Sequence, residues 1–152
     1  MKLTSQAFKH EGKIPSTYTC DGKNVSPPLK IENVPKSAVS LVLIMEDPDV
    51  PKHFRPDGMW DHWIVFNIPP TTTDIPEGTE PQGVPGITTR QNMIYGGPCP
   101  PDREHRYFFK LFALNTMLNL PAGSTKKHVF DAMHGHIIEE TVLLGKYERI
   151  KK

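Results

Sequence analysis

Two aspartates and two histidines stand beside apolar runs of the sequence, and their types and spacing could do chemistry. Asp47 and Asp49 follow one apolar run and flank a proline. Side chains alternate in an extended segment, so both carboxylates project to one face while Pro48 points away. His62 and His105 each open another apolar run. If these ends lie on one side of a sheet, the four side chains form a pocket.

Each of these residues also has an ordinary structural explanation. An isolated Asp-Pro-Asp is common turn chemistry at a solvated rim, and a histidine beside an apolar run is usually a satisfied structural residue. Ionisable residues at the ends of three apolar runs together favour a site, because an unpaired buried polar group costs ~1–3 kcal/mol. The loop around Gly96 and Gly97 adds to the case, since glycines allow close backbone approach and can aim N–H groups at an anion.

The elements that must position these residues are mainly β-strands. Short aromatic or β-branched runs bounded by Pro, Gly and Asp predict strands over residues 40–46, 62–68 and 106–114. Their continuous apolar character indicates central strands that are covered on both faces. Weaker patterns predict strands over residues 3–8, 29–31 and 140–144.

One helix is predicted near the end of the chain, over residues 125–139. Val129, Phe130, Met133 and Ile137 form a single apolar stripe at helical period. Ser124 is the expected N-cap. Gly135 weakens the middle of this segment by up to ~1 kcal/mol.

The composition is that of one soluble domain spanning residues 1–152. The chain is 37% hydrophobic and 23% charged, and its formal net charge of +1 gives no field that would recruit nucleic acid. Sixteen prolines between periodic segments indicate a loop-rich fold with rigid corners. No apolar window is long enough for membrane insertion or resembles a signal peptide, so a cytoplasmic location is predicted.

The two cysteines, Cys20 and Cys99, have no spacing typical of a zinc site or of a disulfide scaffold. Two reduced, partly buried thiols are the favoured interpretation. A single bridge that ties two loops together is the alternative.

Five sequence elements, in order, resemble the phosphatidylethanolamine-binding protein family, which includes the Raf kinase inhibitor proteins and plant flowering-signal relatives. They are YTCDGKNVSPPL, DPDVP, HW followed by IVFNIP, GGPCPP and HRYFF. The late stretch GHIIEETVLLGKYER is similar to the short bacterial and archaeal branch. Each motif alone is weak, but their order and spacing are specific and the resemblance runs nearly end to end.

The resemblance implies a fold, a site and partners. The fold is a mainly β structure with a large antiparallel sheet, a smaller sheet packed against it and short peripheral helices. The implied partners are a small phosphate-like anion and a docked kinase or protease, with a homodimer also possible in this branch. The implied ligand-binding residues are Asp47, Asp49, His62, His105, Tyr107 and Pro98, and Gly97 joins them from the loop argument above. Arg103 and Glu104 depart from the family pattern at the pocket mouth and put ligand preference in question.

Carboxylates repel phosphate, so the aspartates are expected to act through the histidines. In this hypothesis each Asp accepts a hydrogen bond from a His and raises its pKa, and the imidazolium donates to the anion. Phosphate binding would then weaken as the pH rises through the histidine titration. Arg106 alternates away from His105 and is predicted to form a structural ion pair.

Two other functions use the same region. Two His and two Asp could ligate Zn²⁺ or iron in a hydrolase, although no H-E-x-x-H, H-x-H or C-x-x-C spacing occurs. No cofactor is predicted. The loop carrying Phe54, Met59 and Trp60 could instead bind a partner protein, or Trp60 could simply roof the pocket.

Overall fold

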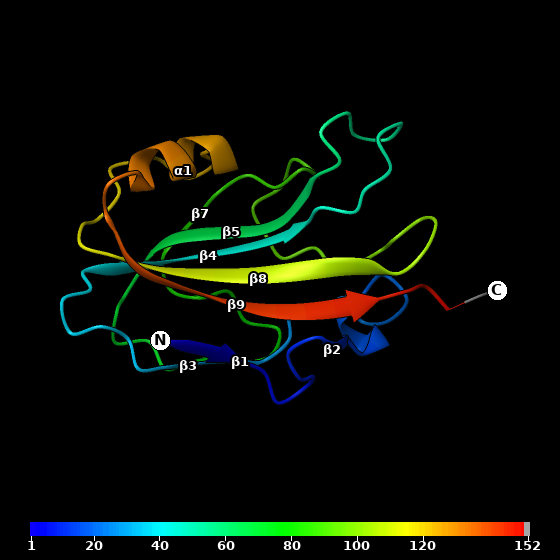
Figure 1. The fold of residues 1–152 in the computed structure, drawn as a ribbon, viewed down its shortest axis with the longest axis horizontal. Helices are drawn as coiled ribbons and strands as arrows, with labels where there is room; N and C mark the ends of the chain where they lie inside the picture. Colours follow the sequence, from blue (N-terminus) through cyan, green and yellow to red (C-terminus); the bar gives the residue numbers. More distant parts are fainter. Residues whose placement is uncertain (151–152) are drawn as a thin grey trace.

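The computed structural model describes residues 1–150 and contains two β-sheets (Figure 1). The larger sheet has six strands, in the spatial order β2 (Gly12–Lys13), β9 (Ile137–Tyr147), β8 (His105–Leu114), β4 (Ser40–Asp47), β5 (Trp60–Ile68) and β7 (Val84–Pro85). The smaller sheet contains β1 (Lys2–Thr4), β3 (Leu29–Glu32) and β6 (Asp74–Ile75). The helices are a 3₁₀ turn, η1 (Ser16–Tyr18), and α1 (Lys126–Met133).

The large sheet forms the middle layer, with α1 on one side and the small sheet on the other (Figure 1). Its pairs are antiparallel except for the short parallel pair β2–β9. The predicted mainly β architecture, with a smaller sheet packed on a larger one and peripheral helices, is confirmed.

The central strand β4 is buried along its whole length because both of its faces are covered. Leu41, Leu43 and Met45 pack toward the small sheet, whereas Val42 and Ile44 pack toward α1. This explains the continuous apolar run, since a strand covered on one side only would alternate. The central strands β4, β5 and β8 lie within two residues of the ranges predicted from the sequence.

The predicted helix over 125–139 extends six residues beyond the observed C-terminal end. α1 ends at Met133, and Gly135 follows with a φ of +81° that breaks the helical path. Ile137 belongs to β9 rather than to the helical stripe. Ser124 is not the N-cap either, because the Thr125 side chain accepts the bond from the His128 amide.

The antiparallel order brings three strand ends together. β4 ends where β5 and β8 begin, because both neighbours pair with it antiparallel. The loops that follow or precede these ends therefore gather at one edge of the large sheet. None of the helices within residues 1–150 has the length and apolar character needed to cross a membrane.

Candidate functional site

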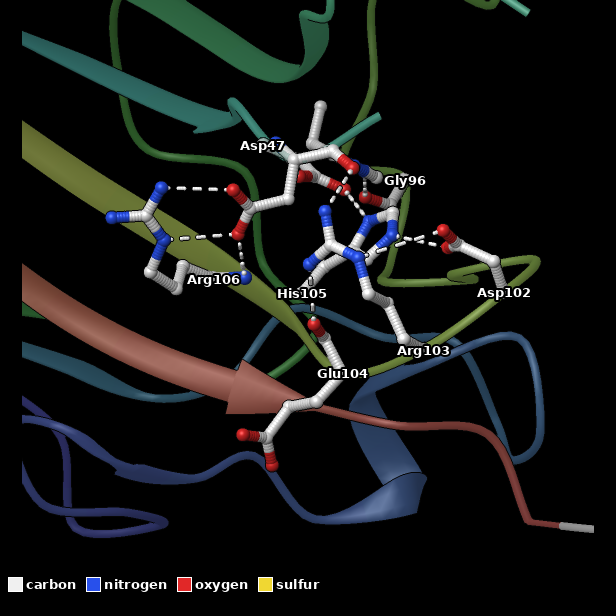
Figure 2. A network of polar contacts seen from close by, with 9 residues as sticks. Asp47, Gly96, Asp102, Arg103, Glu104, His105 and Arg106 are labelled. Carbon is white, nitrogen blue, oxygen red and sulfur yellow. Dashed lines mark hydrogen bonds and ion pairs between the residues drawn. The ribbon is translucent and has the colours of Figure 1, made fainter. Parts of the chain in front are cut away.

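His105 lies between two carboxylates at the start of β8 (Figure 2). Its Nδ1 is 2.7 Å from Oδ2 of Asp47, and its Nε2 is 2.6 Å from Oδ1 of Asp102. The His105 ring is fully buried and Asp47 nearly so, whereas the Asp102 side chain is 39% exposed. The predicted contact between an aspartate and His105 is therefore present, with a second carboxylate that the sequence analysis did not identify.

This trio shares an additional proton. A neutral imidazole has one N–H and can donate only one of the two hydrogen bonds, so either the ring is protonated or one carboxyl group is. Burial raises the pKa of Asp47 above its ordinary value, although the bond from His105 acts in the opposite direction. Asp47 also accepts the backbone N–H of Asp49 at 2.8 Å, which fixes its orientation.

Asp49 does not accept from a histidine, so this part of the sequence prediction is wrong. Its carboxylate binds the Arg106 side chain through two N–H···O bonds of 2.9 and 2.8 Å, and also the Arg106 backbone N–H. The hydrogen bonds from Arg106 hold the pKa of Asp49 below its usual value. The ion pair predicted for Arg106 is confirmed, because consecutive residues of β8 point to opposite faces.

His62 is bound to the backbone rather than to an aspartate. Its Nδ1 lies 2.7 Å from the carbonyl oxygen of Gly96 and must be the protonated nitrogen, because a carbonyl only accepts. Burial lowers the pKa of His62 to about 4. His62 is therefore neutral at pH 7 and cannot supply the imidazolium that the sequence hypothesis required of it.

The stability of the protein is expected to fall on acidification because of His62. The unfolded protein protonates this ring near pH 6.5 and the folded protein only near pH 4, so unfolding takes up a proton between these values. The free energy of unfolding should drop by roughly 2–3 kcal/mol more in the wild type than in His62→Asn between pH 7.5 and pH 4.5. Urea unfolding at both pH values measures this difference. Equal losses in the two proteins would contradict the neutral, buried state of His62.

The glycine loop holds the site together but does not offer its amides to a ligand. The Gly96 N–H donates to the His62 carbonyl at 3.1 Å, and the Gly97 N–H donates to Oδ1 of Asn24 at 2.8 Å. The Pro98 carbonyl accepts the Cys20 N–H. The predicted anion-binding nest is therefore wrong, and Gly97 and Pro98 act as supports behind the cavity wall.

A cavity of about 340 Å³ opens at this edge of the sheet. Asp47, His62, His105 and Tyr107 form its polar floor, and its other lining residues are Val50, Phe54, Trp60, Arg90, Cys99, Pro100 and Pro101. The structure thus brings four of the predicted site residues to one cavity. Asp49, Gly97 and Pro98 do not line it.

Tyr107 carries the most informative group in this cavity. Its side chain is 0% exposed, and its hydroxyl makes no hydrogen bond of ordinary geometry within the described chain, although burial and the neighbouring Asp47 carboxyl group raise the pKa of Tyr107. The ring lies edge-on to His62, with centroids 5.4 Å apart, and is stacked on His105 at 6.4 Å. An unpaired buried hydroxyl costs about 1–3 kcal/mol, so this hydroxyl would gain from a hydrogen-bond acceptor that enters the cavity.

Two residues of the site were not predicted from the sequence: Arg90, which lines the cavity, and Asp102, which contacts His105. Arg90 lies in the loop between β7 and β8 and is exposed at the cavity. Nothing in its neighbourhood of the sequence marks it as different from other surface arginines. Asp102 stands three residues before His105, and this spacing was the only available signal.

Two aromatic residues line the cavity, Phe54 in the loop after β4 and Trp60 at the start of β5. Trp60 is half-buried, while Phe54 is 58% exposed. Trp60 therefore contributes to the roof of the cavity, as one interpretation of the sequence predicted. Docking of a kinase, a protease or another partner on this loop stays a prediction.

Cys20 and Cys99 form a disulfide bond, so the favoured prediction of two reduced thiols is wrong. The alternative, a single bridge between two loops, is correct. The bridge joins the segment after η1 to the cavity wall, 79 residues apart in sequence. A cytoplasmic location stays a prediction, and disulfide bonds are rare in that compartment.

Within the described residues, the side chains proposed as metal ligands are not arranged around a common point. Across residues 1–150 no group of three or more His, Cys, Asp or Glu side chains is arranged to hold a metal ion. Asp49 is directed to Arg106 and both nitrogens of His105 contact carboxylates. The four residues proposed as ligands therefore do not converge on one point.

The fold and the cavity define a two-sheet β protein with a polar-floored cavity at the strand ends. The family model of the phosphatidylethanolamine-binding proteins matches residues 4–148. This chain belongs to the phosphatidylethanolamine-binding protein family, as the motifs of the sequence predicted.

Relatives of known sequence and structure agree with this assignment. A UPF0098 protein of Chlamydia pneumoniae is 50% identical over 149 residues, which cover 98% of this chain and 99% of the relative. A phosphatidylethanolamine-binding protein homologue from Chlamydia trachomatis has a crystal structure with a TM-score of 0.95, 47% identity and 97% coverage of both chains. E. coli YbcL, described as a member of the mammalian family, gives a TM-score of 0.87 at 29% identity and 98% coverage of both chains.

Proposed function

We propose that this protein is a non-enzymatic binding protein for a small phosphate-like anion. The buried, unpartnered hydroxyl of Tyr107 at the cavity floor carries this proposal. A hydroxyl donates strongly to an anionic oxygen, and in a buried site it gains more from such a partner than it would in water.

The cavity offers donors of two kinds. Tyr107 donates a neutral O–H from the floor, and Arg90 supplies a positive charge from the exposed wall. A guanidinium binds two oxygens of a phosphate group at once, and its charge compensates the ligand's charge. These two groups replace the imidazolium donors of the sequence hypothesis.

The cavity also offers acceptors, which restrict the form of the ligand. His62 donates from Nδ1 to a carbonyl, so its Nε2 is an acceptor, and the Asp47 carboxyl group faces the same cavity. A fully ionised phosphate would be repelled by these acceptors. A singly protonated phosphate or phosphomonoester brings its own O–H and satisfies them, so this is the form we expect to bind.

Replacing Tyr107 by phenylalanine is expected to separate binding from folding. Tyr107→Phe should weaken the binding of inorganic phosphate at least tenfold, because one hydrogen bond to a charged group contributes about 1.5–3 kcal/mol. Its free energy of unfolding should rise by about 1–3 kcal/mol, because the variant no longer buries an unpaired hydroxyl. NMR titration with phosphate and urea unfolding measure the two quantities.

Tyr95→Phe is the matched control. The Tyr95 hydroxyl is also buried, but it donates to the Tyr18 carbonyl at 2.7 Å and lies outside the cavity lining. Its removal should cost about 1 kcal/mol of stability and leave the phosphate affinity unchanged. Equal phosphate affinity in Tyr107→Phe and the wild type would overturn the proposed function.

A further inference from the structure

We propose that the Cys20–Cys99 disulfide is a thiol-exchange site that controls the affinity of the cavity for its anion. This inference rests on the proposed function, because it concerns the same cavity. Cys99 lines the cavity and is covalently bound to Cys20 on the opposite segment. The bond therefore belongs to the cavity wall itself.

The wall segment 99–104 depends on few other contacts. Within the described chain its residues make no backbone–backbone hydrogen bond, in contrast to the preceding residues Gly96 and Pro98. Its side chains contribute the bond between Asp102 and the buried His105 ring, and a long bond of 3.4 Å from the Arg103 side chain to the Asp49 carbonyl. The ion pairs of Arg103 and Glu104 lie at the surface. Exposed ion pairs of this kind contribute little. The disulfide is thus the main restraint that holds Cys99, Pro100 and Pro101 against the cavity.

We expect a reductant to reach the disulfide. Both Cys20 and Cys99 are partly exposed rather than buried. A dithiol reductant attacks one sulfur as a thiolate, forms a mixed disulfide and leaves as its own cyclic disulfide. The S–S bond of the protein breaks and two S–H bonds form, while the dithiol is oxidised by the same two electrons. No further reactant is needed.

Reduction is expected to lower the phosphate affinity of the cavity about tenfold. Once the bond is broken, the wall samples other positions, and the apparent dissociation constant rises in inverse proportion to the fraction of molecules with the wall in place. Linkage requires the reverse effect as well, so bound phosphate must favour the disulfide by the same factor. A tenfold factor corresponds to a reduction potential about 30 mV lower in saturating phosphate.

The test uses the wild-type protein with inorganic phosphate as the probe. Phosphate affinity is measured by NMR titration before and after reduction with dithiothreitol, and the reduction potential is measured with and without saturating phosphate. An affinity ratio near ten together with a matching shift in potential supports the proposal. Equal affinities, or a potential that phosphate does not change, would overturn it.

Two controls separate the effect of the broken bond from other effects of the reductant, and the redox inference from the proposed function. Cys20→Ser/Cys99→Ser should bind phosphate as weakly as the reduced wild type and should not respond to dithiothreitol. If the oxidised protein does not bind phosphate, the proposed function fails. Amide hydrogen exchange then decides the redox inference, because unchanged exchange of the amides between 96 and 105 on reduction would show that the wall does not depend on the bond.

Discussion

The Cys20→Ser/Cys99→Ser variant should lose roughly 4 kcal/mol of unfolding free energy relative to the oxidised wild type. The bridge closes a loop across 79 residues, and in the chain-entropy account a cross-link of that length removes many conformations from the unfolded ensemble. Urea unfolding at pH 7 measures the difference. This loss would be a large part of the stability of a domain of this size.

The wild type in dithiothreitol is the control for the serine substitutions. It should unfold at the same urea concentration as the double variant, because both lack the cross-link while their other contacts are equal. A double variant as stable as the oxidised wild type would show that the bridge does not restrain the unfolded chain.

Asp47→Ala should lower the free energy of unfolding by about 3 kcal/mol. The Asp47 carboxyl group is buried and contacts both His105 and the Asp49 amide, so its removal leaves the buried His105 ring and the partly buried Asp49 amide without their partner. Breaking a buried ion pair from one side typically costs 3–5 kcal/mol. The raised pKa of Asp47 indicates that burying its charge is costly, so we expect a loss of stability at the lower end of this 3–5 kcal/mol range.

Asp102→Ala is the matched control, because it removes the other carboxylate from the same histidine. The Asp102 side chain is 39% exposed, so water can replace it, and a loss of about 1 kcal/mol or less is expected. Urea unfolding of both variants at pH 7 gives the comparison. Similar losses in the two variants would show that burial does not determine the strength of these contacts.

The architecture could be predicted from the sequence because its central strands are covered on both faces. The apolar run of β4, which is buried throughout, carries that information directly. β8 departs from the prediction, because Arg106 is exposed and its first half alternates between buried and less buried residues. The end of the helix could not be placed, since Ile137 continues the helical stripe in sequence but lies in a strand after the left-handed Gly135. A periodic pattern does not show where a positive φ interrupts it.

The location of the site was predictable, but its hydrogen bonds were not. Asp47, His62, His105 and Tyr107 meet at one cavity as the motif positions indicated. Which donor each carboxylate receives depends on strand register and on loops that carry no periodic signal. For this reason the sequence did not predict that Asp49 binds Arg106 or that His62 binds a carbonyl. It also did not predict that Arg90 lines the cavity.

The alternation of His105 and Arg106 on β8 has a consequence for folding. His105 points inward to Asp47 and Arg106 outward to Asp49, at the end where β4 and β8 pair. A one-residue slip between these strands would reverse every side chain, placing a guanidinium in the interior and an imidazole at the surface. Misaligned pairings of β4 with β8 are thereby penalised by charge as well as by packing. Asp47 and Asp49 therefore also select the correct register of the central strands.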